Sequence, residues 1–309
     1  MDREIKAASE GGVDFFSLLW YYARPGSEHE AECRLLNRGL ANYLASESKS
    51  SRRVQFMIEF CNSGPFNASE DQDWNRCVEV WTDAWKSPAA LRVEDRIVFK
   101  IHDLSRFIAG NGGDVSRCLM QLTQLRSSVH SAGLGDMIIG GGLMSRSEVH
   151  QDHPAVKLFD FTATYMSIPD TVVGPTELPY KTLVAEARFA REFHSRDPIP
   201  WVPYLPVGWN PRPWTHPEAG ADHRRFFTFP TKSEWVEELK ALWSDFDRFP
   251  GLGLPLRDGS KQPAFTIYAW NEFGEGGILA PTRGIGAMKL EAIRSVFGPS
   301  HPVRNISRG

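Results

Sequence analysis

A chain of 309 residues is too long for a small disulfide-stabilised module and fits one large α/β domain. Its 41% hydrophobic and 24% charged residues are typical of a globular protein, and its net charge of −3 argues against a nucleic-acid or membrane partner. The charged start Met1–Lys6 lacks the apolar core of a signal peptide, and no apolar run approaches the roughly 20 residues that span a bilayer. These features leave the localisation open.

The cysteines and tryptophans restrict the class further. The spacing of the cysteines contains no CxxC pair and no zinc pattern, so we expect free, mostly buried thiols at Cys33, Cys61, Cys77 and Cys118. The chain also has ten tryptophans. Indole rings stack on the C–H faces of sugars in open clefts, and core packing is the alternative for any one of them.

Apolar strand-like runs alternate with amphipathic helical stretches along the chain. The predicted strands are 13–20, 54–59, 96–102, 136–140, 158–164, 201–205 and 264–270. The predicted helices are 3–10, 30–44, 73–85, 115–132, 180–195, 232–246 and 286–297. Runs such as Val13–Trp20 are largely apolar, which suits a parallel sheet covered on both faces.

This alternation, with a helix before the first strand, predicts an α/β fold of the (β/α)8 TIM-type barrel that lacks its first strand. We expect one domain over residues 1–309, incomplete at its N-terminus. An open doubly wound sheet is the alternative. The barrel is favoured because polar and aromatic residues follow nearly every strand, and the carboxyl ends of barrel strands share one face.

The residues that follow the predicted strands are candidates for a substrate cleft. Charged side chains at the end of a buried strand are costly unless they face solvent. For the pair His102–Asp103, a satisfied strand-end pair is the alternative. The candidate substrate-binding residues are Trp20, Tyr21, Tyr22, Glu59, Asn62, His102, Asp103, Tyr165, Trp209, Asn210, Arg212 and Asn271.

The strongest local signal is AWNEFGEGG at 269–277. Its carboxylates, Glu272 and Glu275, lie three residues apart where a strand breaks into a glycine-rich turn, so both can face one pocket. Cleavage of a glycosidic bond needs one carboxylic acid to protonate the leaving oxygen and a second carboxylate as nucleophile or base. We therefore predict that Glu272 and Glu275 are catalytic; two solvated glutamates in a helix-start loop are the alternative.

The segment NEFGEG at 271–276 is similar to the NEW-x-EG motif of glycoside hydrolase family 99 and of the WbsX-like family. The similarity extends to three other segments in the same order. The segment 5–22 resembles the helix and strand of these families, 91–103 resembles their R-[IV]-DGRPV-x-x-IYD segment, and 206–212 resembles their PGWDNTPR strand end.

This resemblance implies a (β/α)8 barrel and a retaining, endo-α-mannosidase-like glycosidase that acts on an oligo- or polysaccharide without a cofactor. By position, Glu272 would assist the 2-hydroxyl of the sugar as a base, and Glu275 would be the acid/base at the leaving group. Phe273 and Ala280 replace the Trp and Glu of the family pattern, which leaves the mannose specificity open. A WbsX-type glycosyl transferase or modifying enzyme and a non-catalytic sugar-binding barrel are the alternatives.

Two further patterns are set aside. His150 and His153 have metal-ligand spacing, but their segment offers no third ligand nearby, so we expect no metal site. Gly140, Gly141 and Gly142 do not form GxGxxG and have no acidic partner at the spacing of a ribose contact, so we expect no nucleotide cofactor.

Overall fold

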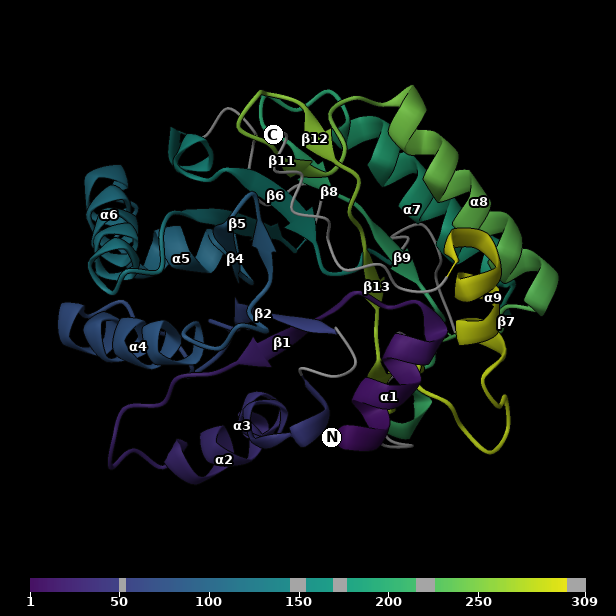
Figure 1. The fold of residues 1–309 in the computed structure, drawn as a ribbon, viewed down its shortest axis with the longest axis horizontal. Helices are drawn as coiled ribbons and strands as arrows, with labels where there is room; N and C mark the ends of the chain where they lie inside the picture. Colours follow the sequence, from purple (N-terminus) through teal and green to yellow (C-terminus); the bar gives the residue numbers. More distant parts are fainter. Residues whose placement is uncertain (50–53, 145–153, 169–176, 215–225, 299–309) are drawn as a thin grey trace.

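The structure is a computed structural model that describes residues 1–49, 54–144, 154–168, 177–214 and 226–298. Parallel strands form a curved sheet, and helices cover its outer side (Figure 1). The strands of this barrel wall are β1 (Phe15–Trp20), β2 (Gln55–Phe60), β4 (Arg96–Ile101), β5 (Met137–Leu143), β6 (Phe161–Thr164), β8 (Trp201–Val202), β9 (Tyr204–Pro206) and β13 (Thr266–Tyr268).

The helices follow the strands in alternation. They are α1 (Asp2–Gly11), α2 (Glu30–Leu36), α3 (Arg38–Ala45), α4 (Asp71–Ala84), α5 (Leu104–Gly110), α6 (Val115–Ser131), α7 (Tyr180–His194), α8 (Lys232–Arg248) and α9 (Met288–Phe297), with 3₁₀ turns η1 (Glu47–Lys49), η2 (Pro154–Leu158) and η3 (Arg212–Trp214). The remaining short strands are β3 (Arg92–Val93), β7 (Glu177–Leu178), β10 (Phe226–Phe227), β11 (Leu254–Pro255), β12 (Lys261–Gln262), β14 (Asn271–Glu272) and β15 (Gly277–Ile278).

The order of the strands confirms the barrel architecture. The sheet runs β1-β2-β4-β5-β6-β8, and β9 pairs with β13, all in parallel register. Pro203 separates β8 from β9, and its carbonyl accepts from the amide of Thr266, so one extended run joins β6 to β13. The alternative of a doubly wound sheet is wrong, because such a sheet reverses its strand order at a switch point.

Alternation along each strand divides the buried apolar side chains between an inner layer and an outer layer, because successive side chains of a strand point to opposite faces. On β4, Phe99 points outward and contacts Trp81 of α4, with ring centroids 4.8 Å apart. Its neighbour Val98 points inward and packs with Phe161 of β6 in the core inside the barrel. The outer core, between sheet and helices, contains Trp74, Trp81 and Trp85, so these tryptophans stabilise the fold rather than line a cleft.

The predicted helix over 30–44 is divided in the structure. Asn37 separates α2 from α3, and its side chain accepts from the amide of Tyr21 and donates to the Tyr21 carbonyl, both at 2.8 Å. This amide pair fixes the segment that leaves β1. The helical pattern continues through Asn37, so only the tertiary contact reveals the break. The short helix α5 was also absent from the sequence prediction.

The three consecutive glycines lie inside β5, which extends beyond the predicted strand end. A Cβ atom on Gly140 would lie 2.2 Å from the ring of Phe161, and one on Gly142 would lie 1.7 Å from the carbonyl oxygen of His102. These glycines are therefore explained by close packing of β5 against its neighbours.

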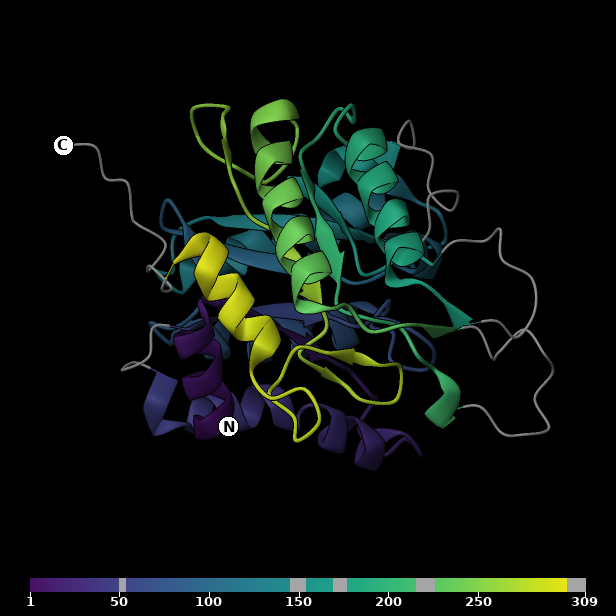
Figure 2. The same cartoon turned by 90° about the vertical axis from the view of Figure 1, so that its right-hand side faces the viewer.

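The barrel wall is open between β13 and β1, which do not pair in the described part of the chain. Outside this gap, the rings of Phe16 and Trp270 meet edge to face at 5.1 Å, and the indole N–H of Trp270 donates to Glu4 of α1 at 2.5 Å. Helix α1 lies beside α9 in both views (Figures 1 and 2). In the described part of the chain, the outer layer is thus continuous across the open edge between β13 and β1.

A cavity of about 1080 Å³ extends along the gap into the barrel interior. Its walls include Phe15, Ser17 and Leu19 of β1 and Thr266 and Ile267 at β13. No helix among the residues that the structure describes is long and apolar enough to cross a membrane.

The gap predicts an alternating pattern of amide protection along β1. The amide of Gln55 donates to Asp14 and that of Cys61 donates to Trp20, so the even-numbered residues of β1 bond to β2. The amides of Ser17 and Leu19 therefore point into the gap. We expect them to exchange with solvent at least about tenfold faster than those of Phe16 and Leu18 in native-state hydrogen exchange. Equal protection would mean that the gap is filled in solution.

Candidate active site

A buried polar cluster occupies the carboxyl-terminal part of the barrel interior. Nζ of Lys100 lies 2.7 Å from Oε1 of Glu59, and Nδ1 of His102 lies 2.6 Å from the same oxygen. The hydroxyl of Ser17 donates to Oε2 of Glu59 at 2.7 Å. Glu59, Lys100 and His102 are each 5% exposed or less. The cluster joins β1, β2 and β4 across the interior face.

The ionisation of Glu59 is determined by its partners. Burial alone would raise the pKa of Glu59, but Lys100 and the hydrogen bond from His102 outweigh it and hold the pKa well below its usual range. Glu59 is therefore a carboxylate at neutral pH, and it compensates the buried ammonium of Lys100. Both Glu59 and Lys100 reach the cavity wall.

Two tyrosines connect this cluster to the last strand. Tyr165, which follows β6, meets the ring of His102 edge to face at 4.8 Å and the ring of Tyr268 at 4.9 Å. The phenol of Tyr268 donates to Oε2 of Glu275. Burial is the largest cause that raises the pKa of Tyr165 and of Tyr268, so both remain phenols.

Glu272 and Glu275 lie on the β14–β15 hairpin directly after β13, and both are half-buried. Burial and the charge of Glu275 raise the pKa of Glu272. The backbone carbonyl of Glu275 accepts from the amide of Asn210 at 2.6 Å, which attaches the hairpin to the loop after β9. The hairpin thus places two carboxyl groups with different surroundings close to the carboxyl-terminal end of β13.

Lys289 of α9 connects the loop after β9 to the hairpin that carries the glutamates. Its ammonium donates to the carbonyl of Val207 at 3.1 Å and to that of Ile278 at 2.6 Å. Burial lowers the pKa of Lys289 to about 8, while its two carbonyl acceptors favour the charged form. One buried cation therefore holds the loop after β9 and the hairpin of the glutamates together.

Several of the predicted site residues line the same cavity. The cavity wall contains Tyr21, Glu59, Tyr165, Asn271 and Glu272. His102 contacts this wall through Glu59 and Tyr165, and Trp209 contacts it through Tyr268, with ring centroids 6.0 Å apart. Asn210 binds the Glu275 backbone. Common position after parallel strands thus places these residues together.

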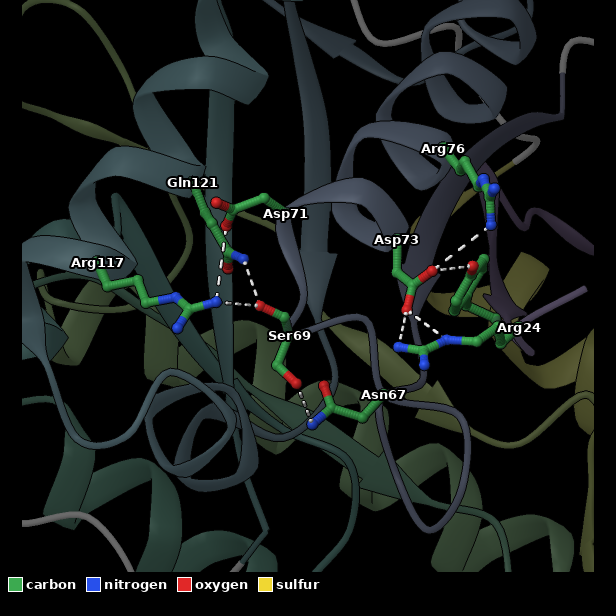
Figure 3. A network of polar contacts seen from close by, with 9 residues as sticks. Arg24, Asn67, Ser69, Asp71, Asp73, Arg76, Arg117 and Gln121 are labelled. Atoms are coloured by element: carbon green, nitrogen blue, oxygen red, sulfur yellow. Dashed lines mark hydrogen bonds and ion pairs between the residues drawn. The ribbon is translucent and has the colours of Figure 1, made fainter.

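Trp20 and Tyr22 are corrections to the predicted cleft. Trp20 shares its face of β1 with Phe16, points away from the interior and packs against Trp81 of α4 at 5.3 Å. The phenol of Tyr22 donates to Asp73 of α4 at 2.6 Å. Figure 3 shows Asp73 with Arg24 and Arg76 turned toward it, in a polar network of α4. Only Tyr21, between them, faces the cavity.

Asn62 and Asp103 also have structural roles. The Asn62 side chain donates to the carbonyl of Asp103 at 2.8 Å and accepts from its amide at 2.9 Å. The Asp103 carboxylate caps α5 by accepting from the amide of Arg106 at 2.9 Å. Arg212 has its guanidinium 3.6 Å from the ring centre of Phe226 and donates to Asn210 at 2.9 Å. It supports the loop after β9 from its exposed side.

Sequence reasoning missed Ser17, Lys100 and Tyr268. All three lie inside predicted strands rather than after them, so a search of strand ends passes over them. Side chains alternate between the two faces of a strand, and Glu59 marks the inner face of the sheet. This alternation would have placed each of the three on the inner face of its strand. The described residues contain no group of three or more His, Cys, Asp or Glu side chains that could hold a metal ion. His150 and His153 lie outside the described residues.

Comparison with solved structures supports the fold. A protein described as a glycoside hydrolase-like protein superposes with a TM-score of 0.61 at 13% identity, covering 96% of this chain and 84% of the other. The GH99 endo-alpha-mannosidase from Bacteroides thetaiotaomicron superposes with a TM-score of 0.51 at 16% identity, covering 96% of this chain and 77% of the other. No family model and no curated protein matches the sequence.

The buried cluster predicts a strong coupling between Glu59 and Lys100. Replacing Lys100 by Met leaves a buried carboxylate without its main counter-charge, so we expect a loss of about 3–5 kcal/mol in the free energy of unfolding. The double variant Glu59→Gln/Lys100→Met should lose less than the sum of the single variants. Urea denaturation at pH 7 measures all three.

Lys86→Met is the matched control, because Lys86 forms an exposed pair with Asp83 at 3.1 Å. It should change the free energy of unfolding by less than about 1 kcal/mol. Because the pKa of Glu59 is lowered on folding, its contribution is present above the unfolded value of about 4.3 and declines as the pH falls below it. Additive single variants would mean that the pair is not coupled.

Proposed function

We propose that this chain hydrolyses an O-glycosidic bond of an α-linked oligo- or polysaccharide, with Glu272 and Glu275 as the catalytic pair. The observation that carries the proposal is this pair itself, placed after the last barrel strand and beside a cavity that Glu272 lines. The carboxyl ends of barrel strands are where enzymes of this fold place their chemistry. The glycoside hydrolase-like neighbour of the same fold agrees with this class.

The surroundings of the two carboxyls suit general acid and base catalysis. Their environments differ, since Glu275 receives a hydrogen bond from Tyr268 and Glu272 has its pKa raised by burial and by the charge of Glu275. Two carboxyls whose proton affinities are separated can act as acid and base at one pH. Aromatic rings at the site, Tyr21 and Tyr165, offer faces for sugar C–H groups.

The finer proposal is a retaining, endo-α-mannosidase-like reaction assisted by the 2-hydroxyl of the sugar. Sequence resemblance assigns the base to Glu272 and the acid/base to Glu275. The hydrogen bond from Tyr268 favours the opposite assignment, because a donated hydrogen bond stabilises the charged form of a carboxylate. Both assignments require both glutamates.

Single substitutions test the pair. Glu272→Gln and Glu275→Gln keep the size of each side chain and remove the ionisable group, so each should reduce kcat/KM on an unactivated α-linked glycan by about 10²–10⁴-fold or more. Glu79→Gln, on the exposed face of α4, is the control and should keep full activity. The measurement is mass spectrometry of the products from α-1,2-, α-1,3- and α-1,6-linked mannose and glucose oligosaccharides.

Full activity in either variant would remove that residue from the mechanism. Transfer to an added sugar acceptor without hydrolysis would identify a transferase instead. A 2,4-dinitrophenyl α-glycoside needs little protonation of its leaving group, so only the variant that has lost the acid should recover on it. ¹H NMR of the first product determines whether the anomeric configuration is retained.

A further inference from the structure

Tyr268 is a buried phenol that is packed on several sides beside the glutamate pair. It lies on the inner face of β13 and is 3% exposed. Its ring lies between Tyr165 at 4.9 Å and Trp209 at 6.0 Å, measured between ring centroids. A Cβ atom on Gly277 would lie 2.6 Å from its Cε1 atom, so the hairpin of the glutamates can pack on the ring only with a glycine there.

The phenol of this fixed ring donates to Oε2 of Glu275. The backbone of Glu275 is fixed as well, since its carbonyl accepts from Asn210 and its amide donates to the carbonyl of Glu272 at 3.3 Å. The orientation of the Glu275 carboxyl is therefore set from both ends of the residue. No side chain in the described part of the chain donates a hydrogen bond to the carboxyl of Glu272.

We propose that Tyr268 is a positioning residue of the glutamate pair, which holds the Glu275 carboxylate in one orientation and in its charged form and so leaves the catalytic proton on Glu272. The inference rests on the proposed function. It makes Glu275 the base and Glu272 the acid in the free enzyme, the reverse of the roles that the sequence resemblance implies.

The electrostatics of the site are consistent with this distribution. Burial and the charge of Glu275 raise the pKa of Glu272, so Glu272 keeps its proton to higher pH than an exposed glutamate. Among the described residues, the phenols whose titration is coupled to the charge of Glu272 are Tyr268, Tyr165 and Tyr21, and the ion pair of Glu59 and Lys100 lies on the same cavity wall. Burial is the largest cause that raises the pKa of each of these phenols, so none competes for the proton at neutral pH. The nearby cation Lys289 binds backbone carbonyls rather than either carboxyl.

The decisive variant is Tyr268→Phe, which keeps the ring and removes the donor. We expect kcat on an unactivated α-linked glycan to fall on the order of 10- to 100-fold with little change in KM, because the Glu275 carboxylate loses its fixed orientation toward the reacting group. The control is Tyr43→Phe, which removes a buried phenol donor to the carbonyl of Val54, away from the site. It should leave kcat and KM unchanged.

The pH profile of kcat/KM separates the two role assignments. If Glu275 is the base, loss of its donor moves the acidic limb to higher pH, by about one unit or more, and the bell-shaped profile narrows. If Glu275 carries the catalytic proton, the same loss moves the basic limb to higher pH and the profile broadens. A narrower profile supports the proposal; a broader or an unchanged profile overturns it.

A second measurement does not depend on activity. ¹³C NMR of glutamate-labelled protein follows the titration of the two carboxyls, which Glu272→Gln and Glu275→Gln assign. In the wild type, the carboxyl that titrates at higher pH should be that of Glu272, and Tyr268→Phe should bring the two titrations closer. If these shifts occur but no glycan is cleaved, the proposed function fails and the positioning role stands. Identical titrations in Tyr268→Phe would overturn the positioning role.

Discussion

A carboxylate buried inside a barrel needs a counter-charge and hydrogen-bond donors beside it, and Glu59 therefore constrains which side chains its neighbouring strands place in the interior. Its partners come from the neighbouring strands, Lys100 on β4, His102 just after β4 and Ser17 on β1. Glu59 lies opposite Lys100 in the parallel register of β2 and β4. A shift of one residue would turn the Lys100 ammonium toward the tryptophans of α4 and leave Glu59 buried without its counter-charge.

The same cluster connects the fold to the proposed chemistry. The ring of His102 contacts Tyr165, the ring of Tyr165 contacts Tyr268, and the phenol of Tyr268 donates to Glu275 on the hairpin of the glutamates. On the far side, Lys289 holds that hairpin against the loop after β9. A glutamate pair can divide the roles of acid and base only if each carboxyl has its own stable surroundings. Tyr268 contacts the carboxyl of Glu275, and Lys289 of α9 fixes the backbone of the hairpin.

The gap between β1 and β13 interrupts the sheet but not the layer of helices around it. Helix α1 and the contact between Phe16 and Trp270 cover it from outside, so the cavity leads from the gap to Glu272 without breaking the helical layer. A parallel barrel strand normally binds neighbours on both edges. The structure thus keeps the curvature of the barrel over consecutive strands, although one pair of edges is left open.

Local patterns in the sequence predicted most of the elements and the barrel, because apolar runs and helical periodicity depend on neighbours in the chain. They also placed Glu272 beside the cavity, since strand ends of a parallel barrel share one face. Which strand-end residues face that cavity was decided by the tertiary structure. Trp20 and Tyr21 are adjacent, yet alternation turns the first to α4 and the second inward.

The break at Asn37, the buried pair of Glu59 and Lys100 and the bond from Tyr268 to Glu275 likewise depend on the tertiary structure. The first two join residues that are distant in the chain. The third joins residues only seven apart, but it forms because Tyr165 and Gly277 fix the ring under the hairpin. The sequence by itself predicted the two glutamates as candidates for the chemistry; only packing decided which side chains meet them, because a charge or a ring is positioned by what surrounds it in space.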